Sequence, residues 1–135
     1  MPPHLDPNVR GARIHLTAAH TRGHVIRSIL EGVAFSLRDS FILFAELGVP
    51  VSSIRLGGGR ARSPLWRQIQ ADVYGHEVES VEVEEGAAYG AAILAGVGAG
   101  MWRSVDEACN EGVRASQVIA PRPSIAKQMD KSYTA

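Results

Sequence analysis

Apolar residues recur at every third or fourth position along residues 21–47, which is the spacing of one face of an α-helix. They form one stripe on that face, made of Ile26, Ile29, Leu30, Val33, Leu37, Phe41 and Phe44. Gly48 is well placed to end the helix in a left-handed conformation, and Pro50 prevents the helix from continuing. The pattern therefore predicts one long amphipathic helix in the first half of the chain.

Two predicted strands flank a second helix further along the chain. Residues 52–56 indicate a short strand, and residues 77–83 alternate between polar and apolar side chains, as in a half-exposed strand. Between them, the Ser63 hydroxyl can accept a free helix amide, and the proline that follows suits the first helical position. Gly75 is suited to end this helix, and an earlier short strand is predicted at residues 12–18.

The second half of the chain adds mostly helices. Residues 86–100 are mostly small and predict a helix that can pack closely against a sheet or another helix. A capping box of the form S-x-x-E at residues 104–107 opens a further helix, which should end near residue 115. Residues 117–120 are expected to form a last strand, and the tail from Pro123 a short surface helix. This alternation predicts an α/β fold with at least partly parallel strands.

The composition is that of a soluble globular protein, with 45% hydrophobic and 21% charged residues. The 135 residues suit a single domain, 1–135, with an irregular lead-in over residues 1–11 and a tail over residues 122–135. The 14 basic and 14 acidic residues give a formal net charge of zero. Nothing in this balance points to a nucleic-acid partner or to an anionic membrane.

Cysteine content and hydropathy bear on the cellular compartment and on membrane association. Cys109 is the single cysteine, so an internal disulfide is impossible and a cytoplasmic location is expected. The sequence has no run of about 18 apolar residues, and its start has no apolar segment of signal-peptide length. We therefore expect neither a membrane span nor a membrane partner.

Three consecutive glycines, Gly57, Gly58 and Gly59, lie between the strand predicted at residues 52–56 and the helix that follows. A phosphate-binding P-loop would need a lysine in the sequence G-x-x-x-x-G-K-[ST], and no lysine follows here. The dinucleotide fingerprint G-x-G-x-x-G is matched only in part, because Arg62 occupies its third glycine position. Spacing alone leaves two interpretations open: a nucleotide-binding turn, or a tight turn that packs a helix against a sheet.

Other polar residues give weaker signals. His20 and His24 are four positions apart, a spacing that metal ligands on one helical face can have. No third ligand is near them in the sequence, so we expect no metal site. Asp39 and Asp72 fall inside predicted helices, where each is expected to be a solvated or helix-pairing charge.

Three sequence blocks occur in the order and at the spacing of a known enzyme family. They are RSILEGVAFSLRDS, LGVPVSSIRLGGGRARSPLWRQIQADVYG and VEEGAAYGAAILAGVGAG. Each block alone is a weak signal. Together they resemble the C-terminal lobe of the FGGY family of carbohydrate kinases, with the xylulose kinases as the nearest branch. The resemblance runs from DPNVRG to about Pro121, which is nearly the whole chain.

This resemblance implies an actin-like, ribonuclease-H-like ATPase lobe, with helices packed on a small mixed sheet, that is incomplete at its N-terminal end. The C-terminal lobe of these kinases supplies most of the ATP site. By position, Gly58 and Gly59, with the adjacent Gly57, match the family's turn beside the nucleotide, and Ser63 matches a small polar residue near the adenosine. Arg60 departs from the family, which usually has a small residue there. Its side chain could reach the phosphates, stack beside the base or point to solvent.

The implied reaction is transfer of the ATP γ-phosphate to a sugar hydroxyl with Mg²⁺, here from ATP to D-xylulose to give D-xylulose 5-phosphate. In this family an aspartate base and phosphate-binding turns lie upstream of the matched region. We therefore assign no catalytic residue to this chain and expect it to be inactive alone.

The resemblance also implies partners. These are ATP, the sugar and the N-terminal sugar-binding lobe, whose absence would leave a sheet edge and part of the long helix's apolar stripe uncovered. Such surfaces predict self-association. Two alternatives stay open: a non-catalytic fragment that binds nucleotide or another protein, and a dinucleotide-binding half-domain.

Overall fold

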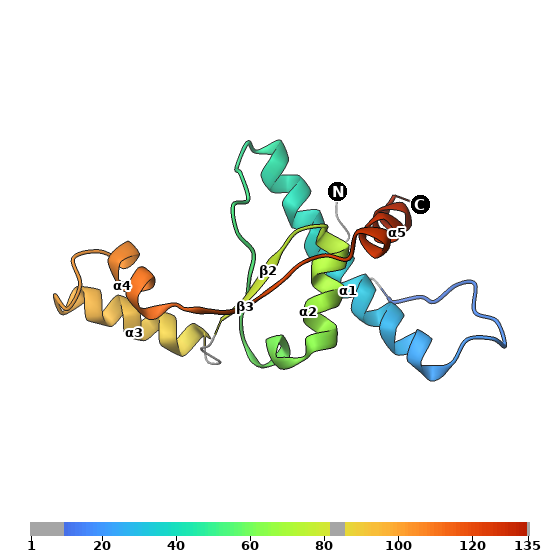
Figure 1. Ribbon diagram of the computed structural model, residues 1–135, viewed down its shortest axis with the longest axis horizontal. Coiled ribbons are helices and arrows are strands. Elements are labelled where there is room, and N and C mark those ends of the chain that lie inside the picture. Colours follow the sequence, from blue (N-terminus) through green and yellow to red (C-terminus); the bar gives the residue numbers. More distant parts are fainter. Residues whose placement is uncertain (1–9, 82–85, 135) are drawn as a thin grey trace.

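The structure is a computed structural model, which describes residues 10–81 and 86–134 apart from the side chain of Arg60. Its elements divide into two regions (Figure 1). Two helices within residues 86–112 extend to one side and form what we call the arm. The remaining helices and the small sheet form the body. Helices packed on a small mixed sheet are the predicted fold class, which is confirmed.

Helix α1, Arg22–Glu46, crosses the body as the longest of the helices (Figure 1). Gly48 follows it with a φ of 70°, and the amide of Leu47 still donates to the carbonyl of Leu43 at 3.0 Å. The helix predicted at residues 21–47 is confirmed to within one residue at each end, because glycine and proline stop it where expected.

Strand β1, Arg55–Leu56, is followed by a short 3-10 helix over Gly59–Arg62 and then by helix α2, Pro64–Tyr74. Helix α2 begins and ends as predicted. The Ser63 hydroxyl accepts a hydrogen bond from the amide of the third helical residue at 3.3 Å, and Gly75 ends the helix with a φ of 67°.

The sheet is mixed and has three strands in the order β1-β2-β3. Strand β2, Val78–Val81, runs parallel to β1 and antiparallel to β3, Ala115–Ile119. Leu56 at the end of β1 lies opposite Ser80 of β2. The β1–α2–β2 unit therefore places the three glycines at the carboxyl end of a parallel strand, the end at which α/β sheets bind ligands.

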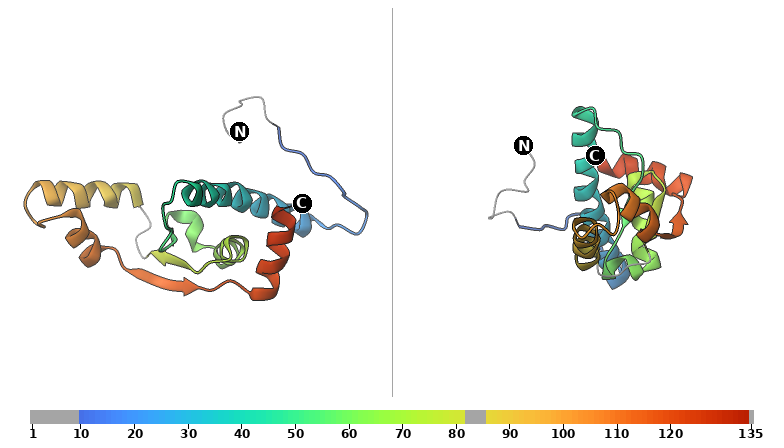
Figure 2. Two further views of the ribbon diagram at one scale, coloured as in Figure 1. Left: turned by 90° about the horizontal axis from the view of Figure 1, so that it is seen from above. Right: turned by 90° about the vertical axis from the view of Figure 1, so that its left-hand side faces the viewer.

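Helix α2 occupies the centre of the body. It packs against α1, against α5, Pro123–Tyr133, and against the sheet (Figure 2). Its last six residues, 69–74, are all buried. The core cluster consists of Ala34, Leu56, Ile69, Ala71, Val73, Tyr74, Val78 and Met129. Because Met129 belongs to α5, the tail helix that was predicted to lie on the surface also supplies a core side chain.

The arm consists of helices α3, Gly86–Gly98, and α4, Val105–Gly112, which pack against each other (Figure 2). The predicted capping box begins α4, since the Ser104 hydroxyl accepts a hydrogen bond from the amide three residues on at 3.1 Å. Trp102, in the loop between the two helices, packs directly over Gly96 of α3. A Cβ added to this glycine would lie 2.4 Å from the indole ring.

Several strand boundaries differ from the prediction. Strand β1 covers only the last two residues of the predicted 52–56, because only these two pair with β2. Strand β3 begins at Ala115, before the predicted start at residue 117, and α4 accordingly ends at Gly112 rather than near residue 115. The strand predicted at residues 77–83 is confirmed as far as Val81, and its last two residues lie outside the described residues.

The strand predicted at residues 12–18 is wrong. These residues form neither helix nor strand, and all of them are exposed, Ile14 at 76% and Leu16 at 55%. A strand needs a neighbour for its backbone hydrogen bonds, and none of the described strands pairs with this segment. His15 also has a φ of 60°, which interrupts an extended backbone.

The apolar stripe of α1 is covered on one side only. Leu30 and Phe41 pack against the core. The other members are each 42–47% exposed, namely Ile26, Ile29, Val33, Leu37 and Phe44. The expectation that part of the stripe lacks a cover is confirmed. Among the described helices, none is both long enough and apolar enough to cross a membrane.

Candidate functional site

The three glycines begin a turn that runs from Gly57 to Ser63, which we call the glycine turn. Gly58 has a φ of 79°, a backbone conformation that favours glycine because other side chains are strained there. The amide of Ala61 donates to the carbonyl of Gly58 at 3.0 Å and closes the first part of the turn. The backbone of Arg60 belongs to the 3-10 helix, and its side chain lies outside the described residues.

The glycines differ in what surrounds them. A Cβ added to Gly57 would make ordinary contact with Val81, at 3.7 Å from its Cγ2. At Gly58 and Gly59 an added Cβ would meet nothing within 4 Å. Gly59 also lacks the left-handed φ of Gly58, so neither its backbone nor its packing against the described residues requires a glycine. The outer side of the turn is therefore open, as a closely approaching ligand would need.

Helix α2 begins directly after this open turn. The Ser63 hydroxyl accepts from the amide of Trp66, which leaves its own hydrogen for another acceptor. Ser63 is exposed, and the proline that follows it has no amide hydrogen to offer a ligand. The positive end of the helix dipole lies here and favours negative charge nearby.

A groove runs beside the turn, between α1 and the beginning of α2. One part is a hollow of about 470 Å³ lined by side chains that include Leu37, Leu56, Ala61 and Trp66. A smaller hollow of about 270 Å³ lies next to Trp66 and Ser63. The walls are mostly apolar, so the groove can hold a flat, weakly polar group next to the turn.

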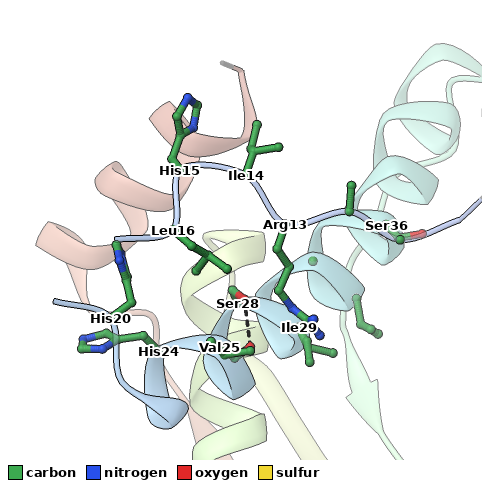
Figure 3. Close-up of a pocket in the computed structure, with 14 residues that line it drawn as sticks. Arg13, Ile14, His15, Leu16, His20, His24, Val25, Ser28, Ile29 and Ser36 are labelled. Atoms are coloured by element: carbon green, nitrogen blue, oxygen red, sulfur yellow. Dashed lines mark hydrogen bonds between the residues drawn. The ribbon is translucent and has the colours of Figure 1, made fainter. Parts of the chain in front are cut away.

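Another hollow, of about 760 Å³, lies elsewhere (Figure 3). Its outer wall is the irregular segment of residues 11–16, and its floor is the exposed face of α1. Arg13 reaches toward Ile29, while His15 points away from the helix (Figure 3). This wall is an exposed segment without regular structure, and the polar side chains of His20, His24 and Ser28 in the lining already hydrogen-bond to backbone groups nearby. We therefore do not take the hollow as the site.

The structure gives both histidines of the sequence pattern a capping role. His20 lies before α1, so the pair does not share one helical face as the spacing suggested. Nδ1 of His20 accepts from the amide of Thr17 at 3.0 Å, and Nδ1 of His24 accepts from the amide of Thr21 at 3.1 Å. A neutral imidazole has one acceptor nitrogen, and here it is used. This argues against the pair as metal ligands, and no group of three candidate ligands occurs in the described part of the chain.

For Asp72 the sequence left two alternatives, a solvated charge or a helix-pairing charge. The first is wrong because Asp72 is 1% exposed, whereas pairing is observed. Its carboxylate accepts from the amide and guanidinium of Arg122, at 2.8 Å and 2.6 Å, and from Gln68 at 3.1 Å. Burial by itself raises the pKa of the Asp72 carboxyl, but these hydrogen bonds outweigh it and hold the pKa below its ordinary value. Arg122 lies 50 positions away in the sequence, so no local pattern could reveal this pair.

Comparison with known proteins identifies the family. The sequence profile of the C-terminal domain of the FGGY family of carbohydrate kinases matches residues 1–99. The chain belongs to this family. The resemblance that the sequence blocks indicated is thus confirmed, and the chain corresponds to the family's C-terminal domain.

Relatives of this FGGY domain include two kinds of kinase. The chain is 39% identical over 120 residues to a xylulose kinase of Bacillus subtilis, across 89% of this chain and 24% of that protein. It is 42% identical over 106 residues to a glycerol kinase of Bordetella parapertussis, across 78% of this chain and 21% of that protein. The chain therefore spans about a quarter of the length of the curated relatives it matches.

Solved structures are consistent with this family assignment. A xylulose kinase from Rhodospirillum rubrum superposes on 96% of this chain and 26% of its own, with a TM-score of 0.82 and 32% identity. A Plasmodium falciparum glycerol kinase, solved with ADP, superposes on 98% of this chain and 27% of its own, with a TM-score of 0.77 and 24% identity. The second likeness concerns the fold alone.

Proposed function

We propose that this chain is the ATP-binding C-terminal part of a carbohydrate kinase that transfers the ATP γ-phosphate to a sugar hydroxyl. The observation that supports it best is the open glycine turn, which lies at the carboxyl end of β1 and directly before the capped start of α2. Gly59 supports it most, because nothing in the described packing requires a glycine there. The family of the chain consists of carbohydrate kinases.

The residues present fit an adenine nucleotide. The backbone at Gly57, Gly58 and Gly59 would lie beside it, where a side chain would clash, and Ser63 would use its free hydroxyl hydrogen toward the adenosine. We include Arg60 in the same proposed site because its backbone belongs to the turn. The apolar groove beside Trp66 offers room for the base. Mg²⁺ would arrive with the nucleotide and neutralise charge on its phosphates; we assign no ligand for it to this chain.

We infer that the sugar is D-xylulose, phosphorylated to D-xylulose 5-phosphate. The Bacillus subtilis xylulose kinase matches 120 residues of the chain, and the Bordetella parapertussis glycerol kinase matches 106. A cytoplasmic location suits this reaction and agrees with the free thiol of Cys109. The N-terminal sugar-binding lobe of such a kinase would be the partner of this chain.

A substitution in the turn tests the nucleotide site. In a full-length kinase that contains this domain, Gly59→Val should raise the KM for ATP much more than the KM for the sugar, because the new side chain fills the open space beside the turn. Gly32→Val is the matched control, since an added Cβ at Gly32 also meets nothing within 4 Å but lies in α1. An unchanged KM for ATP in a folded Gly59→Val enzyme would contradict the assignment.

The chain by itself offers a second test. It spans about a quarter of its relatives, so a fragment that binds nucleotide without turnover is the alternative for the isolated chain. With Mg·ATP and D-xylulose, the purified chain should release no ADP above background, because phosphoryl transfer requires groups that position both partners. Sugar-dependent ADP release that persists through purification would contradict this expectation.

A further inference from the structure

Arg67 connects the beginning of α2 to the sheet. Its side chain is half-buried, and Nη1 donates to the Ser80 hydroxyl at 3.2 Å and to Oε1 of Gln117 at 2.9 Å. Ser80 lies on β2 and is only 4% exposed. Nε of Arg67 is buried and has no hydrogen-bond partner among the described residues. A buried nitrogen without a hydrogen-bond partner costs free energy, and its presence in Arg67 therefore calls for an explanation in terms of function.

This contact joins the two ends of the glycine turn. Leu56, the last residue before the turn, lies opposite Ser80 in the sheet. At the other end, the amide of Arg67 donates to the carbonyl of Ser63 at 3.1 Å, within the first turn of α2. The Arg67–Ser80 hydrogen bond therefore closes a ring that contains Leu56, the glycine turn, Ser63 and Arg67. While this ring is intact, it limits how far the two ends of the turn can separate.

Neighbouring hydroxyls hold the acceptor in place. The Ser80 and Ser116 hydroxyls lie 2.9 Å apart, and the Ser116 hydroxyl also donates to the carbonyl of Ser80 at 3.2 Å. In a buried network, loss of one member leaves the others without partners, so its members act as a unit. The acceptor that Arg67 uses is thus fixed to β2 and β3 together.

We propose that Arg67 is a positioning residue of the nucleotide site, which keeps the glycine turn open for the nucleotide by its hydrogen bond to Ser80. Arg67 acts through the turn and does not itself touch the nucleotide. The inference rests on the proposed function for its nucleotide part, whereas the effect on the turn can be measured without any ligand.

The first measurement is hydrogen exchange of the amides in residues 57–63 of the chain without nucleotide. Arg67→Met keeps the length of the side chain but removes its donors, and the double variant Ser80→Ala/Gln117→Ala removes both of its acceptors. Both variants should exchange faster in the turn than the wild type, because its ends are no longer joined. Arg27→Met is the matched control: it removes a guanidinium that pairs with Glu31 within α1, and the turn should exchange as in the wild type.

The second measurement is the affinity of the same proteins for Mg·ADP. Arg67→Met and Ser80→Ala/Gln117→Ala should each weaken it about tenfold or more, as expected for the loss of at least one charged hydrogen bond. Combining all three substitutions should weaken it no further, because each variant already breaks the same link. Arg67→Lys should restore the affinity only in part, since one ammonium does not reproduce the planar fork of the guanidinium.

The outcomes separate the two proposals. Unchanged exchange of the turn in a folded Arg67→Met chain would overturn the positioning role. Weaker Mg·ADP binding in Arg67→Met but not in Ser80→Ala/Gln117→Ala would overturn it as well, because Arg67 would then contact the nucleotide directly. Such a contact would also make the effect of Arg67→Met smaller at high salt, whereas a positioning effect should be independent of salt. No binding of Mg·ADP by the wild type would overturn the nucleotide site itself, while the exchange data still decide whether Arg67 holds the turn.

Discussion

In the body, branched and aromatic side chains from elements far apart in the sequence meet around α2. The arm instead consists of two consecutive helices beside the body (Figure 2), and its closest contacts are at glycines. The body encloses side chains such as Ile69, Val73 and Val78 almost completely. The arm buries little besides Ile93 and Ala108, among its described residues. Both regions are helical, but they gain stability in different ways.

The difference shows which substitutions each region should tolerate. The body combines apolar burial with an ion pair between the buried Asp72 and the half-exposed Arg122, which fixes the start of α5. The arm depends on two close approaches instead, Trp102 over Gly96 and the Tyr89 hydroxyl against the carbonyl of Gly112 at 2.8 Å. In the body, the most destabilising substitution should therefore be one that removes a charge from this ion pair. In the arm, a substitution that adds one methyl group at a closely packed glycine should be destabilising.

The largest effect should come from Asp72→Ala in the body. Removing one partner of a buried pair costs about 3–5 kcal/mol, and we expect about 3 kcal/mol because Arg122 is half exposed and can regain water. Urea denaturation of the chain measures this loss of unfolding free energy. Glu31→Ala, which removes a carboxylate from the ion pair with Arg27, should cost about 0.5 kcal/mol or less. A loss for Asp72→Ala as small as that of the control would show that the buried pair does not hold the body.

The same carboxylate predicts how stability depends on pH. The pKa of Asp72 in the folded chain lies below its ordinary value of 3.8, so its contribution to stability is complete above that value. The contribution is lost as the pH falls through the lower, folded pKa. Asp72→Asn should therefore be less stable than the wild type at neutral pH, and the difference should shrink in acid. Parallel stability curves down to low pH would contradict the lowered pKa.

In the arm, Gly96→Ala should be the damaging substitution. Its new Cβ would lie 2.4 Å from the ring of Trp102, and overpacking of this kind costs about 1–3 kcal/mol. Gly90→Ala, in the same helix with nothing within 4 Å, should instead stabilise by up to about 1 kcal/mol. Thermal unfolding compares the two variants. Because the arm and the body pack separately, the Gly96→Ala and Asp72→Ala effects should add, and strong non-additivity would contradict their independence.

The sequence predicted those parts of the fold that depend only on residues close together in the chain. Gly48, Ser63 and Gly75 act within one helical turn of their own positions, so the ends of α1 and α2 could be found without tertiary information. The glycine turn could be placed for the same reason. The resemblance to the family then gave the fold class. The periodic pattern alone gave only a mixture of helices and strands.

The parts that failed depend on distant partners. Residues 12–18 have the composition of a strand, but none of the described strands pairs with them. For Asp72 the sequence could not decide between a solvated and a paired charge, because its partner Arg122 lies 50 positions away at the start of α5. In the candidate site, Arg67 was missed because its acceptors, Ser80 and Gln117, lie on strands that follow later in the chain.

A smaller effect should follow from Tyr133→Phe, which loosens α5 on the body. The Tyr133 hydroxyl donates to the carboxylate of Asp39 at 2.5 Å, and the guanidinium of Arg38 lies 4.4 Å from its ring centroid. Loss of the hydrogen bond should cost about 1 kcal/mol at neutral pH. That hydrogen bond, together with burial and the charge of Asp39, raises the pKa of Tyr133 above 10.0. The bond therefore stabilises below pH 10.0 and is lost as the pH rises through the folded pKa. Urea denaturation at neutral and alkaline pH should show the two proteins converging; a constant difference would contradict this account.

The smallest effect on stability, but a clear one on association, should come from Ile29→Lys on the uncovered face of α1. Ile29 is 46% exposed and lies outside the core cluster, so we expect a cost of about 0.5 kcal/mol or less. An exposed row of large apolar side chains favours contact with another chain, so the wild type should self-associate as its concentration rises. A lysine in the middle of that row should shift the chain toward the monomer, which light scattering over a concentration series measures. Ser36→Lys is the matched control, because it adds the same charge to an exposed position of the same helix without removing an apolar side chain. A wild-type chain that stays a monodisperse monomer at high concentration would show that the uncovered face of α1 does not drive association.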